Sequence, residues 1–133
     1  MTEFLTKDEI YKIQDITTDE LVIPEWGNKA VLVRGLAATE LDDYETSMVE
    51  AKKSGAQVNL TNLRARLVVR SVVLPDGRLM FDDKDAEWLG AKNAAAVDRI
   101  YALAQKKCGR TKQDEEELAK NLGSIPAADS TSG

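Results

Sequence analysis

Apolar positions along this chain recur mostly with helical spacing, beginning close to the first residue. Thr6 and Glu9 have the spacing of a capping box, in which a hydroxyl and a carboxylate satisfy free backbone donors at a helix start. Leu5 and Ile10 occupy the two positions of a hydrophobic staple around that box. The pattern predicts a short helix that ends near Ile13.

The next segment breaks the helical pattern and predicts a β-hairpin. Glu20–Ile23 and Ala30–Val33 are rich in β-prone residues, and the turn signal Gly27-Asn28 lies between them. Pro24 lacks an N–H for a strand ladder, so the first strand must lie at an edge or end there. Because two strands alone are marginally stable in water, the hairpin must pack on helices or join a sheet from another chain.

Two longer helices are expected in the middle of the chain. Residues 38–53 carry an apolar stripe with helical spacing, made of Leu41, Tyr44, Met48 and Ala51. Residues 60–74 are ambiguous, because their β-branched residues favour a strand while four leucines share one helical face. The length of this stretch favours a helix, capped by Asn59, apolar nearly all round and therefore central and buried.

The remaining elements follow from turn and cap signals. Pro75-Asp76-Gly77 predicts a turn, followed by a short extended or buried link at residues 79–81. Asp82 or Asp83 is expected to cap a short helix through Leu89, with Gly90 as its stop. Two more helices are predicted, one capped by Asn93 and ended by Gly109, with the stripe Val97, Ile100, Tyr101, Ala104 and Cys108, and an acidic one from Thr111 to about Leu122.

These elements predict a mainly α (α+β) fold, a helical bundle of about five helices with one small N-terminal β-hairpin. Residues 1–122 are expected to form a single domain with the hairpin near residues 20–34. Residues 123–133 are small and polar, and they predict a disordered tail.

Charge argues against several classes of partner. The chain of 133 residues has a net charge of −5, which disfavours nucleic acid and anionic membranes. Residues 60–110 carry 10 basic and 6 acidic side chains, and the segments on either side are acidic. A basic middle between acidic ends favours internal neutralisation or head-to-tail contact with another copy. The apolar runs are too short for a membrane span, so we expect no membrane partner.

The side chains needed for most enzyme chemistry are missing. The chain has no histidine and a single cysteine, Cys108, whose place on an apolar stripe favours a structural thiol over a nucleophile. Asp82-Asp83-Lys84-Asp85 lacks the pattern of a calcium loop, and helix-start acids explain it better than a metal site. Arg64, Arg66 and Arg70 are better explained by ion pairing with the acidic N-terminal half than by a basic patch. We expect no enzyme, no cofactor and no metal.

The two tryptophans are the strongest candidates for a binding surface. Trp26 lies beside the hairpin turn, where an aromatic ring can anchor an interface or fold back onto the helices. From the sequence the two interpretations are equally favoured. The candidate partner-binding residues are Pro24, Trp26, Val31, Val33 and Trp88.

The order of segments is similar to that of the small tail assembly chaperones of long-tailed bacteriophages and related prophages of Gram-positive hosts. The resemblance runs from Leu5 to Leu122 and rests on "LTKDEI", "VIPEWGNKAVLVRGLAATELDDYE", "VNLTNLRARLVVRSVVLPDGRLMFDDKDAEWLG" and "NAAAVDRIYALAQKKCG". These motifs are not catalytic signatures. Ala37 departs from the pattern, since Thr or Ser is expected there to cap the next helix.

The resemblance implies a role and a set of partners. Such chaperones act in the host bacterial cytoplasm, bind the tape measure protein, keep it soluble while the tail tube assembles, and are absent from the mature virion. The expected partners are the tape measure protein, further copies of the chain in a homo-oligomer and, as an additional candidate, the major tail tube protein. The alternatives are a structural virion component, such as a head–tail connector or tail completion protein, and a small cytoplasmic adaptor unrelated to phage.

Overall fold

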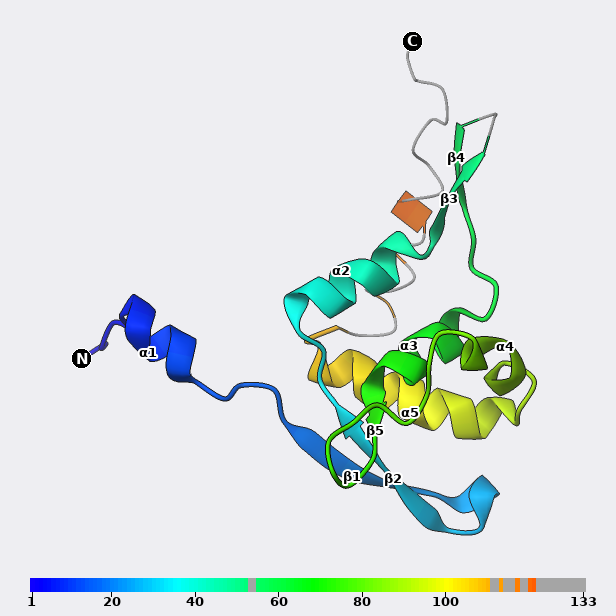
Figure 1. Ribbon diagram of the computed structural model, residues 1–133, viewed down its shortest axis with the longest axis horizontal. Helices are drawn as coiled ribbons and strands as arrows, with labels where there is room; N and C mark the ends of the chain where they lie inside the picture. Colours follow the sequence, from blue (N-terminus) through cyan, green and yellow to red (C-terminus); the bar gives the residue numbers. More distant parts are fainter. Residues whose placement is uncertain (53–54, 111–112, 114–116, 118–119, 122–133) are drawn as a thin grey trace.

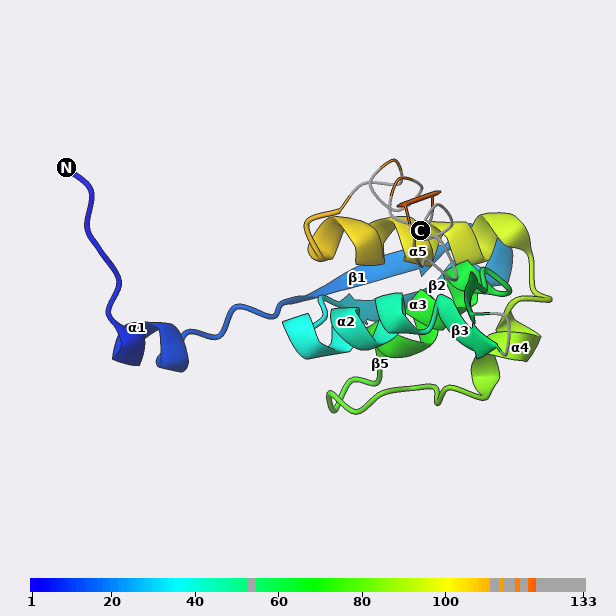
Figure 2. The ribbon, with the colours of Figure 1, turned by 90° about the horizontal axis from the view of Figure 1, so that it is seen from above.

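The structure, a computed structural model, describes residues 1–52, 55–110, 113, 117, 120 and 121. Within them, five α-helices, one 3-10 helix (η1, Pro24–Trp26) and five β-strands form a mixed α+β fold rather than a pure helical bundle. Helix α5 (Ala94–Lys107) packs against the sheet and against α3 (Leu63–Ser71), as Figures 1 and 2 show. One buried apolar cluster joins these elements.

The first helix is confirmed, but it stands apart from the core. Helix α1 (Lys7–Lys12) has the predicted capping box, with Thr6 N–H donating to Glu9 Oε1 and Glu9 N–H to Thr6 Oγ1. These hydrogen bonds lower the pKa of the Glu9 carboxyl. No residue of α1 is buried, and the helix projects from the body on an extended segment (Figure 1).

The predicted hairpin is confirmed and belongs to a larger sheet. Strands β1 (Thr18–Ile23) and β2 (Lys29–Arg34) pair antiparallel, with Leu21 opposite Val31. The turn uses left-handed backbone at Gly27 (φ 77°) and Asn28 (φ 58°). Strand β5 (Val72–Val73) adds to the other edge of β2, so the hairpin is completed within its own chain.

The helix expected at residues 38–53 is wrong in its second half. Helix α2 (Ala38–Thr46) ends early, and β3 (Val49–Lys52) pairs with β4 (Gly55–Val58) in a second hairpin. Two stripe positions, Tyr44 and Met48, are still buried. Strand pairing satisfies the backbone groups that a longer helix would have bonded internally, an alternative that helical periodicity alone does not reveal.

The helix expected at residues 60–74 is shorter than predicted for a related reason. Helix α3 is central and buried as expected, but its C-cap Val72 is already extended. Val72 and Val73 then pair with Val33 and Leu32, where their β-branched side chains suit a strand. The predicted cap Asn59 is also wrong, since its Oδ1 accepts from Thr61 N–H and the N-cap is Asn62.

The later elements follow the prediction closely. Gly77 (φ 91°) forms the turn, and helix α4 (Asp85–Leu89) follows, although its N-cap Lys84 replaces the expected aspartates and Gly90 keeps a right-handed φ of −62°. Asn93 caps α5 as predicted, with Oδ1 accepting from Ala96 N–H at 3.1 Å. The acidic helix expected from Thr111 to Leu122 and the tail at 123–133 lie largely or wholly outside the described residues.

Candidate functional site

The two tryptophans lie on one apolar groove at the end of the body that carries α4. The groove has a volume of about 370 Å³. Strands β2 and β5 form its floor, while η1, α4, α5 and the link after β5 form its walls; its lining residues are Trp26, Val31, Val72, Met80, Phe81, Trp88, Leu89, Lys92 and Ile100. The volume is within the range of ordinary ligand-binding pockets.

Trp26 is held at the groove by the short helix η1. The ring is half-buried and packs against the core cluster, as expected if it folds back onto the helices, while its role as an interface anchor stays a prediction. Its neighbour Glu25 fixes η1 to α5, because Arg99 Nε and Nη2 donate to the two carboxylate oxygens at 2.9 and 3.0 Å. This pairing lowers the pKa of the Glu25 carboxyl and raises the pKa of the Arg99 guanidinium. The ion pair between Glu25 and Arg99 therefore positions the neighbouring Trp26.

Trp88 forms the outer wall and is 47% exposed. Its indole N–H donates to Asp85 Oδ1 at 2.7 Å, which is the largest cause of the lowered pKa of the Asp85 carboxyl. Phe81 meets the indole edge to face, with ring centroids 5.9 Å apart. Lys92 Nζ lies 6.0 Å from the indole centroid, at the distance of a cation–π contact. These contacts fix the ring while leaving much of it open to solvent.

The other candidate residues divide between surface and core. Val31 is half-buried on the floor of the groove, and Pro24 is exposed at the start of η1. Val33 is fully buried at 0% exposure, so its side chain belongs to the core. Because Val31 and Val33 are two residues apart on β2, both face the helices, but only Val31 lies near the opening.

Several groove residues were missed by the sequence interpretation. Met80 and Phe81 belong to the link that was recognised only as extended or buried. The apolar run at 79–81, next to an exposed turn and an acidic segment, was the available signal. Leu89 ends α4, Lys92 lies in the turn after it and Ile100 belongs to α5, and no local pattern places them beside η1.

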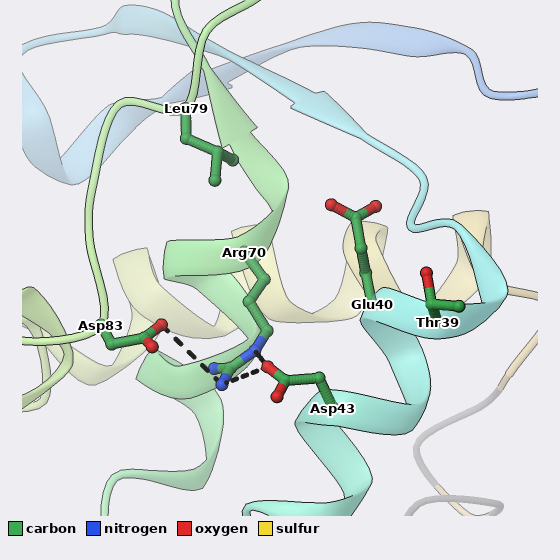
Figure 3. A pocket seen from close by; sticks show the side chains of 6 residues that line it. All are labelled: Thr39, Glu40, Asp43, Arg70, Leu79 and Asp83. Atoms are coloured by element: carbon green, nitrogen blue, oxygen red, sulfur yellow. Dashed lines mark hydrogen bonds and ion pairs between the residues drawn. The ribbon is translucent and has the colours of Figure 1, made fainter.

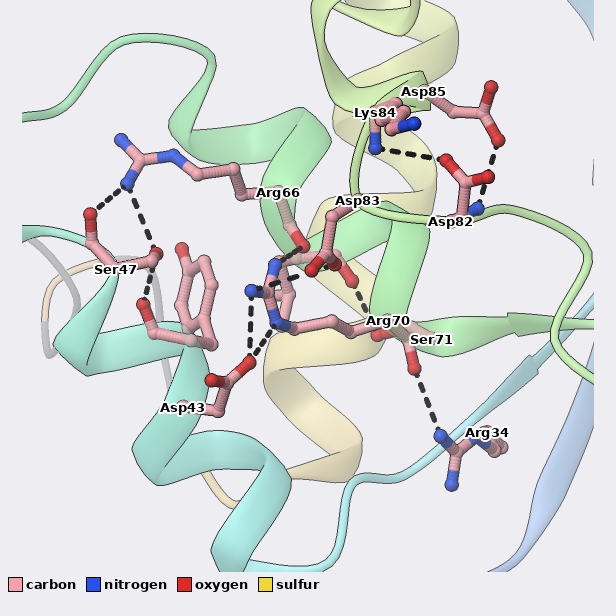
Figure 4. Close-up of polar contacts among 12 residues, drawn as sticks. Arg34, Asp43, Ser47, Arg66, Arg70, Ser71, Asp82, Asp83, Lys84 and Asp85 are labelled. Carbon is pink, nitrogen blue, oxygen red and sulfur yellow. Dashed lines mark hydrogen bonds and ion pairs between the residues drawn. The ribbon is translucent and has the colours of Figure 1, made fainter.

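The three arginines of α3 have structural partners. Arg66 Nη1 and Nη2 donate to the Ser47 and Asn59 carbonyl oxygens at 2.6 and 2.5 Å, tying α2 to the chain that follows β4. Arg70 pairs with Asp43 at 3.0 Å, and Arg64 pairs with Asp98 at 3.5 Å. Figure 4 shows Arg66 and Arg70. The predicted pairing with the acidic N-terminal half is therefore confirmed for Arg70, while Arg64 pairs elsewhere.

A second, polar hollow of about 260 Å³ lies between α2 and the link after β5 (Figure 3). Arg70 is held there between Asp43 and Asp83, whose carboxylates lie 3.0 and 3.8 Å from Nη2. Glu40, on the same hollow, receives two hydrogen bonds from Arg34 at 3.0 and 2.6 Å. The cationic groups are matched by carboxylates, as expected of a structural network.

The remaining chemical expectations concern metals, thiols and membranes. In the part of the chain that the structure describes, no three His, Cys, Asp or Glu side chains are grouped to hold a metal ion. Cys108 is half-buried at the C-cap of α5. Among the same described residues, no helix has the length and apolar character needed to cross a membrane.

Comparison of the chain with protein-family models, with curated proteins and with solved structures gives no match.

Proposed function

We propose that this protein is a tail assembly chaperone of a long-tailed bacteriophage, which binds the tape measure protein in the host cytoplasm and leaves before the virion is complete. The observation that carries the proposal is the open apolar groove that contains both tryptophans. The proposal also rests on the order of the sequence segments between Leu5 and Leu122, which resembles that of the tail assembly chaperones.

The groove offers what reversible binding of an apolar helix requires. A tape measure helix has apolar side chains at helical spacing, and a helix of this kind binds by laying that face into a hydrophobic groove. Trp88 supplies a large, rigid and partly exposed anchor, Trp26 supplies the facing wall and Val31 supplies part of the floor. Binding through such contacts keeps apolar client surface from aggregating without any covalent step.

Co-expression with the tape measure protein of the same phage tests the proposal. We expect the wild-type chain to raise the soluble fraction of the tape measure protein, and Trp88→Ala to lose most of this effect. Leu60→Ala is the matched control, because Leu60 is a comparably exposed apolar residue (44%) that does not line the groove. Equal insolubility with and without the wild-type chain would refute the proposal.

Mass spectrometry of purified virions tests the second half of the proposal. A chaperone that leaves during assembly is expected to be absent from mature particles. If the chain is instead an abundant virion protein, it is a structural component such as a connector or tail completion protein.

A further inference from the structure

The N-terminal arm, residues 1–17, is an apolar surface that its own body does not cover. Seven large apolar side chains of the arm are exposed: Met1, Phe4, Leu5, Ile10, Tyr11, Ile13 and Ile16. Phe4 and Tyr11 are each 88% exposed. Soluble proteins expose single apolar side chains freely, but seven large ones within the first 17 residues indicate an interaction surface.

The arm nevertheless contains a formed helix. Helix α1 has only 6 residues, and isolated helices shorter than about 12–15 residues are marginal in water. The capping box fixes its first turn, but no tertiary contact of α1 buries a side chain. The described part of the chain therefore does not supply the packing that normally stabilises such a helix.

The arm and the groove lie at opposite ends of the body. Lys107 Nζ holds the root of the arm, with Thr17 Oγ1 at 2.9 Å and Asp19 Oδ2 at 3.1 Å. The groove lies at the other end of α5, beside Lys92. From the root, the arm points away from α4 and from the turn between β1 and β2, which carry residues of the groove (Figures 1 and 2). Docking into its own groove would require a complete reversal of the chain at Thr17.

Size and charge fit the arm to the groove of another copy. The apolar side chains of the arm can bury roughly 500–1,000 Å², which brackets the area that one partner contributes to a standard interface. The arm has four acidic and two basic side chains, and among the described residues that line the groove the one charged side chain is a cation, Lys92. A carboxylate of the arm can therefore pair with Lys92 at the groove.

We propose that the N-terminal arm of one copy docks, through Tyr11, Ile10 and their apolar neighbours, into the Trp26–Trp88 groove of a second copy. The contact is heterologous, because two different surfaces meet, and it therefore generates a ring or an open chain of copies. This self-association does not depend on the proposed chaperone function. A client helix that uses the same groove would compete with the arm.

A complementation experiment with full-length variants tests the proposal. The arm variant, Ile10→Asp/Tyr11→Asp, places two charges on the apolar surface of the arm. The groove variant, Trp88→Glu, places a charge in the groove. The control, Leu60→Asp, adds a charge at an exposed site outside both surfaces. Analytical ultracentrifugation should show wild-type and Leu60→Asp chains associating with rising concentration. Because each lost apolar anchor lowers affinity about ten-fold or more, the arm variant, which loses two anchors, should associate about 100-fold more weakly. The groove variant, which loses one anchor, should associate at least about ten-fold more weakly.

An equimolar mixture of the arm variant and the groove variant gives the decisive test of which two surfaces meet. One variant retains an intact groove and the other an intact arm, so the mixture should form a dimer and stop there. Tryptophan emission provides a second readout, because both tryptophans of the chain line the groove. The emission of the wild type should shift to shorter wavelength as its concentration rises, and that of the arm variant should not.

Four results would overturn the proposal. The first is that the wild type stays monomeric at all concentrations, and the second is that the arm variant still associates. The third is that the mixture does not form a dimer. The fourth is that the tryptophan emission of the wild type lies at shorter wavelength than that of the arm variant at every concentration. The last result would mean that the arm folds onto its own groove.

Discussion

At the scale of single residues, Gly90 is required for a close approach and not for backbone freedom. Its φ of −62° suits any residue, so the glycine is not the left-handed helix stop that the sequence suggested. A Cβ at this position would lie 2.2 Å from Asn62 Oδ1 and 3.3 Å from the Ala86 carbonyl oxygen. The absence of a side chain lets the end of α4 pack against the start of α3.

Gly90→Ala is therefore expected to displace the Asn62 side chain and to destabilise the protein by about 1 kcal/mol, at the low end of the cost of overpacking. Chemical denaturation measures the effect. The control is the same substitution in an Asn62→Gly background, where the nearest obstructing atom is gone and the cost of Gly90→Ala should be much smaller. An equal cost in both backgrounds would assign the strain to another contact.

The ion pair between Arg34 and Glu40 makes stability depend on pH. Hydrogen bonds from the guanidinium, followed by one from Ala37 N–H, lower the pKa of the Glu40 carboxyl below its ordinary value of 4.5, although partial burial opposes the shift. The Ala37 contact also replaces part of the missing helix cap, with Glu40 Oε1 at 2.9 Å from the backbone nitrogen.

Because the folded pKa of Glu40 is depressed, its contribution to stability is present above pH 4.5 and is lost as the pH falls through the folded pKa. Glu40→Gln should therefore lower stability at neutral pH and flatten the acid side of the stability profile. Denaturation at a series of pH values measures this, with Glu20→Gln as a control on exposed strand β1. An unchanged acid slope in Glu40→Gln would contradict the assignment.

At the scale of elements, the start of α5 depends on one side chain. Asn93 Oδ1 accepts the Ala96 N–H, one of the donors that a helix leaves free at its first turn. Asn93→Ala should cost about 1 kcal/mol, whereas Asn93→Asp or Asn93→Ser keeps an acceptor and should cost much less. Thermal denaturation of the three variants measures the difference, and equal melting temperatures would show that the cap contributes little.

The element boundaries show where sequence patterns succeed and fail. Caps and turns are local, so Thr6, Gly77, Asn93 and Gly109 were predicted correctly. The ends of α2 and α3 were predicted wrongly, because both helices give way to strands. Strand β3 forms a hairpin with β4, which helical periodicity hides, and β5 pairs with the distant strand β2. The sequence pattern predicts that Val72 continues the helix, but in the structure Val72 pairs with Val33 of strand β2.

At the scale of the whole molecule, substitutions of the two tryptophans should affect stability and binding differently. Trp26 packs against the core, so Trp26→Ala should lower the free energy of unfolding by about 2–4 kcal/mol and also weaken binding. Trp88 is 47% exposed, so Trp88→Ala should change stability by less than about 1 kcal/mol while weakening binding.

Denaturation curves and a self-association or client-binding measurement on each tryptophan variant test this separation. The matched comparison is between the two rings of one groove, since they differ mainly in burial. A large stability loss in Trp88→Ala with unchanged binding would show that the outer wall of the groove is structural.

The candidate site could be predicted from the sequence only in part. Trp26, Val31 and Trp88 were recognised because tryptophan is scarce in this chain and the hairpin has a clear turn signal. Met80, Leu89 and Lys92 were not, because helix and strand periodicities describe one element at a time. That these segments share one opening follows only from how α4 and η1 pack around α5.

Three local features of this protein can be predicted from its residues: a capped helix at the start, a Gly-Asn hairpin and a central helix. They follow from interactions between residues a few positions apart. Three further features appear only in the folded chain: the hairpin gains a third strand, both tryptophans line one groove and the first helix stands uncovered. Each of these depends on contacts between distant segments, which form only when the apolar core is assembled.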